Sequence, residues 1–296
     1  MLGTRPTTVG APDVVLTSSV TSRVAIIAGA GAFPFHVARE AKRQGLWVFA
    51  LGVQGWADGH LAGHVDAYEE VAVGQLGHLI DRLRAHGVSQ AIMAGKVTKD
   101  VLFTTRLSFD TEALGVLSQI REYSVSALLG AIAERLSRDG IVLLDSSTFL
   151  KANLCPEGVL TTCAPDASEQ ADIQVGWAAA RALAQLDVGQ TVVVKGRVVV
   201  AVEALEGTDA TIQRAHELVG GGVVVVKVAS PNQDRRFDLP VVGPETMAVL
   251  RKASARCLAV EAGITLLLDR EQLIAQANAA GVCLIGMKLP DASAGG

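Results

Sequence analysis

The pattern that most constrains the fold is a regular alternation of short apolar runs with amphipathic segments in the first half of the chain. The apolar runs predict buried strands over residues 23–28, 46–51, 67–73, 90–94 and 141–144. Helices are expected over residues 35–44, 76–85, 111–117 and 124–138. Strands joined by crossover helices form a parallel sheet with right-handed connections, so we predict a parallel-sheet α/β domain.

The second half has a different order of apolar and amphipathic segments, which predicts a mixed α/β domain. Residues 191–200 read as two strands about a turn at Lys195 and Gly196, and helical and strand-like segments then alternate up to residue 286. Residues 145–168, with their prolines and glycines, read as a linker and loop. We therefore expect a flexible leader over residues 1–20, an N-terminal domain over residues 21–147 and a C-terminal catalytic domain over residues 148–296. The leader has no apolar core, so it does not resemble a signal peptide.

Composition excludes several classes of function. The chain of 296 residues carries a formal net charge of -4, which argues against a general electrostatic nucleic-acid binder. No apolar run reaches the roughly 20 residues that a transmembrane helix requires. The 4 cysteines contain no CxxC pair, which is typical of a reducing compartment and disfavours zinc. We expect a soluble protein of the cytoplasm.

A glycine-rich turn follows the first expected strand. Gly29 and Gly31 let the backbone approach a phosphate, and the helix that follows presents free N–H groups. A dinucleotide fingerprint would place glycine where Pro34 stands and an acid after the second strand, where Gly52 and Val53 are found. A nicotinamide cofactor is therefore disfavoured, while a tight turn that binds nothing remains the alternative.

A second loop follows the fourth expected strand and contains Gly95 and Lys96. Ligands of open parallel sheets bind beyond the carboxyl ends of the strands, and lysine is a usable partner for phosphate. The loop is not a Walker motif, and a surface lysine is the simpler interpretation. His60 and His64 have the spacing of a metal site, but neighbouring glycines weaken the helix it needs, so structural histidines are favoured.

Acidic residues gather in the second half. Glu203 and Glu206 end a strand, and Thr208 and Asp209 open a helix, where either could act as a cap. Asp234 and Asp238 are four positions apart and enclose Arg235 and Arg236. Carboxylates bind Mg²⁺ together with substrate phosphates, and arginine forks match phosphate oxygens. This segment favours metal-assisted phosphoryl chemistry, with exposed ion pairs as the alternative.

At these same segments the chain resembles the LpxI-type UDP-2,3-diacylglucosamine pyrophosphatases of lipid A biosynthesis. The strings AVEALEGTDA (201–210) and QDRRFDLP (233–240) are the most specific, and the similarity extends over residues 24–287. Glu122, Tyr123 and Ser124 depart from it, because a Gly-Asp-Asp turn would be expected there. Further matching stretches lie at residues 27–31, 73–77, 94–97, 187–190 and 260–263.

The resemblance implies a Rossmann-like N-terminal domain, a family-specific C-terminal domain and a substrate chamber between them. It implies hydrolysis of UDP-2,3-diacylglucosamine to UMP and 2,3-diacylglucosamine 1-phosphate (lipid X), with Mg²⁺ or another divalent cation such as Mn²⁺. Water would attack the β-phosphorus, and Asp238 and Asp234 are the expected catalytic residues. The expected metal ligands are Asp238, Asp234, Glu206 and Asp209, and the expected substrate-binding residues are Gly29, Gly31, Gly95, Lys96, Thr208, Lys227, Arg235 and Arg236.

Two other classes of function remain as alternatives. One is a nucleotide-sugar or lipid-binding protein without catalysis, and the other is a Rossmann oxidoreductase, which Pro34 disfavours. The expected partners are the nucleotide-linked substrate and the lipid product, without nucleic acid. A homodimer and a transient, peripheral contact with the inner membrane also follow as expectations.

Overall fold

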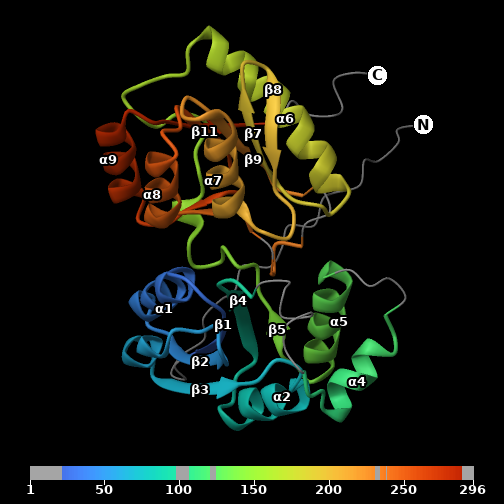
Figure 1. Ribbon diagram of the computed structural model, residues 1–296. Helices are drawn as coiled ribbons and strands as arrows, with labels where there is room; N and C mark the ends of the chain where they lie inside the picture. Colours follow the sequence, from blue (N-terminus) through green and yellow to red (C-terminus); the bar gives the residue numbers. More distant parts are fainter. Residues whose placement is uncertain (1–21, 98–106, 121–124, 231–233, 238, 289–296) are drawn as a thin grey trace, which may run out of the picture.

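The computed structural model of the protein describes residues 22–97, 107–120, 125–230, 234–237 and 239–288. Two α/β domains follow one another along the chain, and Figure 1 shows them one above the other, each with its own sheet. The predicted leader over residues 1–20 lies outside the described residues. The two-domain α/β architecture expected from the sequence is confirmed.

The first sheet is five-stranded and parallel, in the order β3-β2-β1-β4-β5. This is the strand order of a doubly wound sheet, and it reverses between β1 and β4. Alternate residues of each strand face opposite sides, so Ile26 packs towards α1 and Leu51 towards α2. The strands are β1 (Arg23–Ala28), β2 (Trp47–Val53), β3 (Ala67–Val71), β4 (Gln90–Ala94) and β5 (Val142–Leu143). The helices are α1 (Phe33–Arg43), α2 (Leu76–Ala85), α4 (Thr111–Leu117) and α5 (Val125–Arg138), with a 3₁₀ helix η1 at Gly59–His64.

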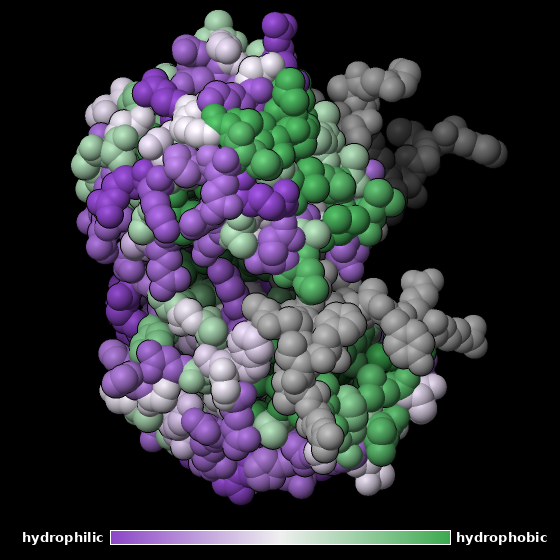
Figure 2. All heavy atoms as spheres, viewed as in Figure 1, coloured by the Kyte–Doolittle hydropathy of each residue, from purple (hydrophilic) through white to green (hydrophobic). Residues whose placement is uncertain are grey.

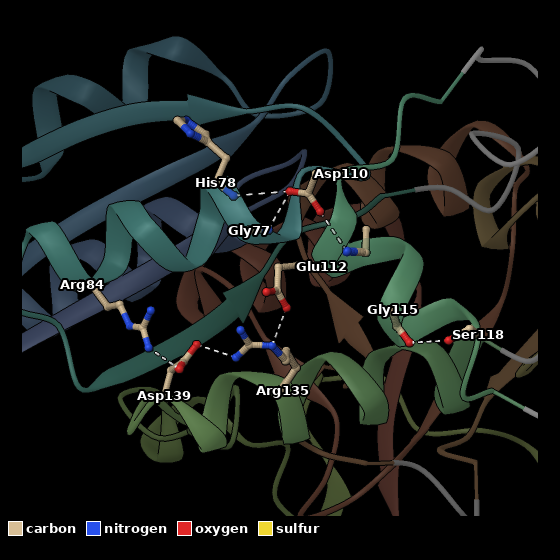
Figure 3. Close-up of polar contacts among 10 residues, drawn as sticks. Gly77, His78, Arg84, Asp110, Glu112, Gly115, Ser118, Arg135 and Asp139 are labelled. Atoms are coloured by element: carbon tan, nitrogen blue, oxygen red, sulfur yellow. Dashed lines mark hydrogen bonds and ion pairs between the residues drawn. The ribbon is translucent and has the colours of Figure 1, made fainter.

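One carboxylate caps the first turns of two helices on the α2 side of this sheet (Figure 3). Asp110 accepts hydrogen bonds from the Ala113 amide of α4 at 2.8 Å and from the Gly77 amide of α2 at 2.7 Å. Glu112 of α4 then accepts from Arg135 of α5 at 2.7 Å, and Arg135 also contacts Asp139. The three helices are thereby tied together by charged side chains as well as by their apolar faces.

Replacing Asp110 by alanine is expected to lower the free energy of unfolding by about 2 kcal/mol, because each lost helix cap costs about 1 kcal/mol. Ser118→Ala is the matched control, since the exposed Ser118 hydroxyl only donates to the Gly115 carbonyl at 2.8 Å. The control should change stability by no more than about 0.5 kcal/mol. Urea denaturation followed by circular dichroism measures both, and equal effects would contradict the double capping role of Asp110.

The second sheet is six-stranded and mixed, in the order β6-β13-β11-β9-β7-β8. β9, β11 and β13 are parallel, while β7 pairs antiparallel with β8 and with β9. Helix α6 covers one face, and α7, α8 and α9 cover the other. The strands are β6 (Gly158–Val159), β7 (Thr191–Lys195), β8 (Val198–Val202), β9 (Val224–Lys227), β11 (Cys257–Glu261) and β13 (Cys283–Met287). The helices are α6 (Ala167–Gln185), α7 (Thr208–Val219), α8 (Pro244–Lys252) and α9 (Arg270–Ala280), with a short 3₁₀ helix η2 at Lys151–Asn153.

The longest helix of this domain, α6, was not predicted. Several of its residues towards the sheet are small, and Gly176 lies so close to β9 that a Cβ there would be 2.6 Å from a Val226 methyl carbon. Ala180 and Ala184 are also buried against the strands. A helix that packs through glycine and alanine carries little apolar periodicity, so the sequence pattern did not reveal it.

The second half of the chain also completes the core of the first domain. Strands β10 (Val241–Val242) and β12 (Leu266–Leu267) form a small parallel pair. Leu266 and Leu268 are buried in the same cluster as Val24 and Ile26 of β1. At the same place His36 of α1 contacts the Asp269 carboxylate at 3.2 Å. The chain therefore crosses between the two domains more than once, and the predicted boundary between residues 147 and 148 stays a prediction.

The strand β8 forms an edge of the second sheet, and its surface is apolar. Val198 is 64% exposed and Val199 is 38% exposed, and Figure 2 shows apolar side chains gathered in this region. The expected homodimer stays a prediction. Of the helices in the described part of the chain, none combines the length and the apolar character needed to cross a bilayer.

Candidate active site

The two glycine-containing loops of the first domain lie side by side at the point where the strand order reverses. The Gly29 amide donates to the Ala94 carbonyl at 2.8 Å, and Ala30 and Lys96 exchange backbone hydrogen bonds of 2.8 and 2.9 Å. A Cβ on Gly29 would lie 2.6 Å from the Lys96 carbonyl oxygen, and one on Gly95 would lie 2.7 Å from the Gly29 carbonyl carbon. Both loops therefore need glycine in order to approach each other.

These contacts bring four residues with predicted roles together: Gly29, Gly31, Gly95 and Lys96. Gly31 has φ +91° just before α1, a backbone conformation that favours glycine. Gly31, Gly95 and Lys96 are exposed, whereas Gly29 is buried. An exposed lysine beside a helix N-terminus, at the switch point of a parallel sheet, is a suitable place for an anionic ligand.

A segment of the second domain docks on the same edge of the first sheet. The Ser146 amide, just after β5, donates to the Arg235 carbonyl at 2.9 Å. The buried Ser146 hydroxyl lies 2.9 Å from the Met93 carbonyl oxygen and 2.8 Å from that of Arg236. Phe237 packs against the core of the first domain. Residues 234–237 are thus held where β4 and β5 end.

The charged side chains of this docked segment form two ion pairs. The Arg235 guanidinium lies 3.1 Å from the Asp145 carboxylate and 3.4 Å from the Ser147 hydroxyl. Asp234 accepts from Arg236 through both carboxylate oxygens, at 2.9 and 2.5 Å. The hydrogen bond from Arg236 holds the pKa of Asp234 below its usual value. The sequence indicated Asp234, Arg235 and Arg236, but it did not indicate Asp145 or Ser146, although both directly follow a predicted strand.

A second polar group lies at the carboxyl end of β9 in the second domain. The Lys227 ammonium is buried and donates to the Thr208 hydroxyl at 2.8 Å, at the start of α7. The Thr208 hydroxyl donates in turn to the buried Glu203 carboxylate at 2.9 Å. Asp234 follows Lys227 by seven positions, so the Cα atoms of the two residues are at most about 25 Å apart along an extended chain.

The remaining acidic residues with predicted roles are not gathered into a metal site. Glu206 accepts from Arg214 at 2.6 Å and from the Ala204 amide at 3.1 Å. Asp209 lies in the first turn of α7, and Asp238 lies outside the described residues. Within the described ranges, no three side chains of the kinds that bind metals are grouped as a ligand set. The described carboxylates alone therefore do not fit a protein-built metal cage, and the metal ligands stay predictions.

The two histidines with metal-like spacing have separate partners. The His60 imidazole lies 2.7 Å from the Asp58 carboxylate, while His64 packs edge-on against Phe35 at a centroid distance of 5.3 Å. The structural role that the sequence favoured for both histidines stays a prediction.

These features define a two-domain α/β protein with two loops suited to phosphate binding at a topological switch point and a buried polar group at the end of β9 in the second domain. The comparisons with known proteins assign it to a family. The model of the LpxI N-terminal domain matches residues 23–153, and that of the LpxI C-terminal domain matches residues 156–285. The chain belongs to the LpxI family.

One curated relative is similar over almost its whole length. It is the UDP-2,3-diacylglucosamine pyrophosphatase LpxI of Caulobacter vibrioides, which is 30% identical over 276 residues, 90% of this chain and 97% of the relative. A solved structure, CobK precorrin-6A reductase, covers 91% of this chain and 88% of its own at 15% identity. Its TM-score of 0.29 is too low for any structural argument.

Proposed function

We propose that this protein hydrolyses the diphosphate bond of UDP-2,3-diacylglucosamine, releasing UMP and 2,3-diacylglucosamine 1-phosphate. Membership of the LpxI family and the name of the relative from Caulobacter vibrioides support the reaction. The observation that carries the proposal is the docking of residues 234–237 on the edge where the loops of Gly29 and Lys96 meet. A diphosphate bound there would contact both domains, and sites between domains are common for small ligands.

The residues on this edge suit the charges of the substrate. Free amide groups near Gly31 and the Lys96 ammonium would bind phosphate oxygens, and Arg235 would exchange part of its contact with Asp145 for the ligand. Water would attack the β-phosphorus, the bond to the UMP oxygen would break, and UMP would leave with the electron pair. Asp238, from the sequence resemblance, would orient the attacking water or accept its proton.

A divalent cation is part of the proposal, because the substrate and product carry several negative charges. Mg²⁺ usually keeps several waters and binds through one or two carboxylates together with substrate phosphates. Asp234 would have to exchange its Arg236 contact for such an ion, and Glu206 its Arg214 contact. The cation would stabilise the charge that develops on the departing UMP.

The deciding experiment is to incubate the full-length protein with UDP-2,3-diacylglucosamine and to measure UMP release, with and without EDTA. UMP and the lipid phosphate are expected in equal amounts. Exhaustive chelation should lower turnover by at least about a hundredfold, a loss typical of one strong electrostatic contribution to the transition state, and added Mg²⁺ or Mn²⁺ should restore it. Full activity after chelation would contradict the metal requirement. Binding of the substrate without UMP release would contradict the hydrolase and favour a non-catalytic binding protein.

A further inference from the structure

Lys227 is a buried cation in an unusual position. Its side chain, at the end of β9, is buried, yet no carboxylate forms a direct ion pair with it in the described part of the chain. It reaches instead to Thr208, the first residue of α7. The N-terminus of a helix carries a partial positive charge, so a cation placed there is disfavoured. A buried ammonium in this position requires compensation from other groups.

The compensation comes from Glu203 through two hydroxyl groups. Lys227 donates to the Thr208 hydroxyl at 2.8 Å and to the Thr191 hydroxyl at 3.3 Å. The Thr208 hydroxyl donates to the Glu203 carboxylate at 2.9 Å and lies 3.2 Å from the Thr191 hydroxyl. Burial raises the pKa of Glu203, but the charge of Lys227 and these hydrogen bonds outweigh burial, so the pKa lies below its usual value. Glu203 is therefore a buried anion that is connected to the buried Lys227 cation by two hydrogen bonds through the Thr208 hydroxyl.

Backbone contacts with residues 189 and 190 hold Glu203 in this position. Gly189 approaches it so closely that a Cβ at position 189 would lie 2.0 Å from the Glu203 carbonyl oxygen. The Gln190 amide also donates to the Glu203 carboxylate, at 3.4 Å. The neighbouring strand β11 ends in Glu261, but that carboxylate is held by Arg181 of α6 on the opposite face of the sheet. Of the four connected side chains only Thr208, at the start of α7, is partly exposed.

We propose that Glu203 is a positioning residue that acts through Thr191 and Thr208 to hold the Lys227 ammonium at the start of α7, where it binds a phosphate group of the ligand. The ammonium has three protons, and two of them are directed to the threonine hydroxyls. The third proton and the free amides of the first turn of α7 together offer a phosphate oxygen several donors. The proposal depends on the proposed function for the identity of the ligand.

The test is a double-mutant cycle read out by ligand binding. The dissociation constants of UMP and of uridine are measured by calorimetry for the wild type, Glu203→Gln, Lys227→Met and the double variant. We expect Lys227→Met to weaken UMP binding about 10- to 100-fold and Glu203→Gln about 5- to 20-fold, since a charge-assisted hydrogen bond is lost or misdirected. Uridine, which has no phosphate, should bind all four proteins within about twofold of each other. In the Lys227→Met background, Glu203→Gln should have no further effect.

Three outcomes would overturn the proposal. They are an effect of Glu203→Gln that persists in the Lys227→Met background, an equal weakening of uridine and UMP binding, and unchanged UMP binding in Lys227→Met.

Glu169→Gln is the control variant, because it removes a carboxylate paired with Arg256 elsewhere in the domain. It measures how far the loss of a paired carboxylate weakens UMP binding in general. If Glu203→Gln does not fold, Thr208→Val interrupts the same connection at nearly constant shape and should weaken UMP binding equally. If the wild type releases no UMP from UDP-2,3-diacylglucosamine, the proposed function fails. The double-mutant cycle is then repeated with the dissociation constants of inorganic pyrophosphate.

Discussion

Asp238→Asn should lower kcat by about 10²- to 10⁴-fold while leaving substrate binding nearly unchanged, because a group that transfers or orients a proton mainly in the transition state contributes on that order. The side chain keeps its size and loses its charge, so the fold should be preserved. The flanking residues Phe237 and Leu239 pack against the two core clusters of the first domain, and the substitution leaves both of them unchanged. Single-turnover measurement of UMP release separates the chemical step from binding.

Asp234→Asn is the matched variant, because it changes an aspartate of the same segment whose carboxylate is paired with Arg236. It should lower kcat less than Asp238→Asn does, and it should also raise KM because Arg236 loses its partner. A kcat for Asp238→Asn above about a tenth of the wild-type value would remove Asp238 from the catalytic group, since a tenfold loss is only about 1.4 kcal/mol.

Separating the chain into residues 21–147 and 148–296 is expected to abolish turnover in both fragments. Leu150, Leu266 and Leu268 come from the second fragment but are buried in the core of the first domain. Each fully buried leucine contributes roughly 2 kcal/mol, so the first fragment would lose about 6 kcal/mol, comparable with the whole stability of an ordinary domain. The second fragment would expose the same leucines to water and lose the docking surface of residues 145–147.

Co-expression of the two fragments should restore part of the activity, because the buried leucines can then return to their places. The measurement is kcat/KM for UMP release by each fragment alone and by the purified pair. A C-terminal fragment that hydrolyses the substrate at near-native kcat/KM would show that the first domain is no part of the site.

Local patterns were sufficient to predict most of the fold. Strands β1, β2 and β4 are short runs of mostly buried apolar residues, and such runs are recognised without knowledge of their neighbours. Helix α6 escaped prediction because it packs through Gly176, Ala180 and Ala184, which are weakly hydrophobic and give no clear face. The short strand β6 escaped because it lies within residues 145–168, whose prolines and glycines read as a loop.

Residues of the candidate site could be predicted only where they belong to a short sequence motif, such as a glycine-containing loop after a strand. Gly29 and Lys96 were expected because each follows a strand, and the structure places their loops in contact. Ser146 was missed because its partners, Met93 and Arg236, are far from it in sequence, so only the folded chain connects them. Glu203 was noted only as an acid at the end of a strand, since its relation to Lys227 depends on the pairing of β7 with both β8 and β9.

The shared core also has a consequence for the order of folding during synthesis. The strand β1 is translated early, but the Leu266 and Leu268 side chains that cover it are made more than two hundred residues later. At a usual rate of roughly 5–20 residues per second, the first domain would wait on the order of 10 to 50 seconds on the ribosome with the part of its core that Leu266 and Leu268 complete still open to water. Contacts so distant in sequence are also slow to form, because a long loop must close first. We therefore expect the amides of β1 and α1 to gain protection from hydrogen exchange together with those of β12, rather than with those of α2 and β3.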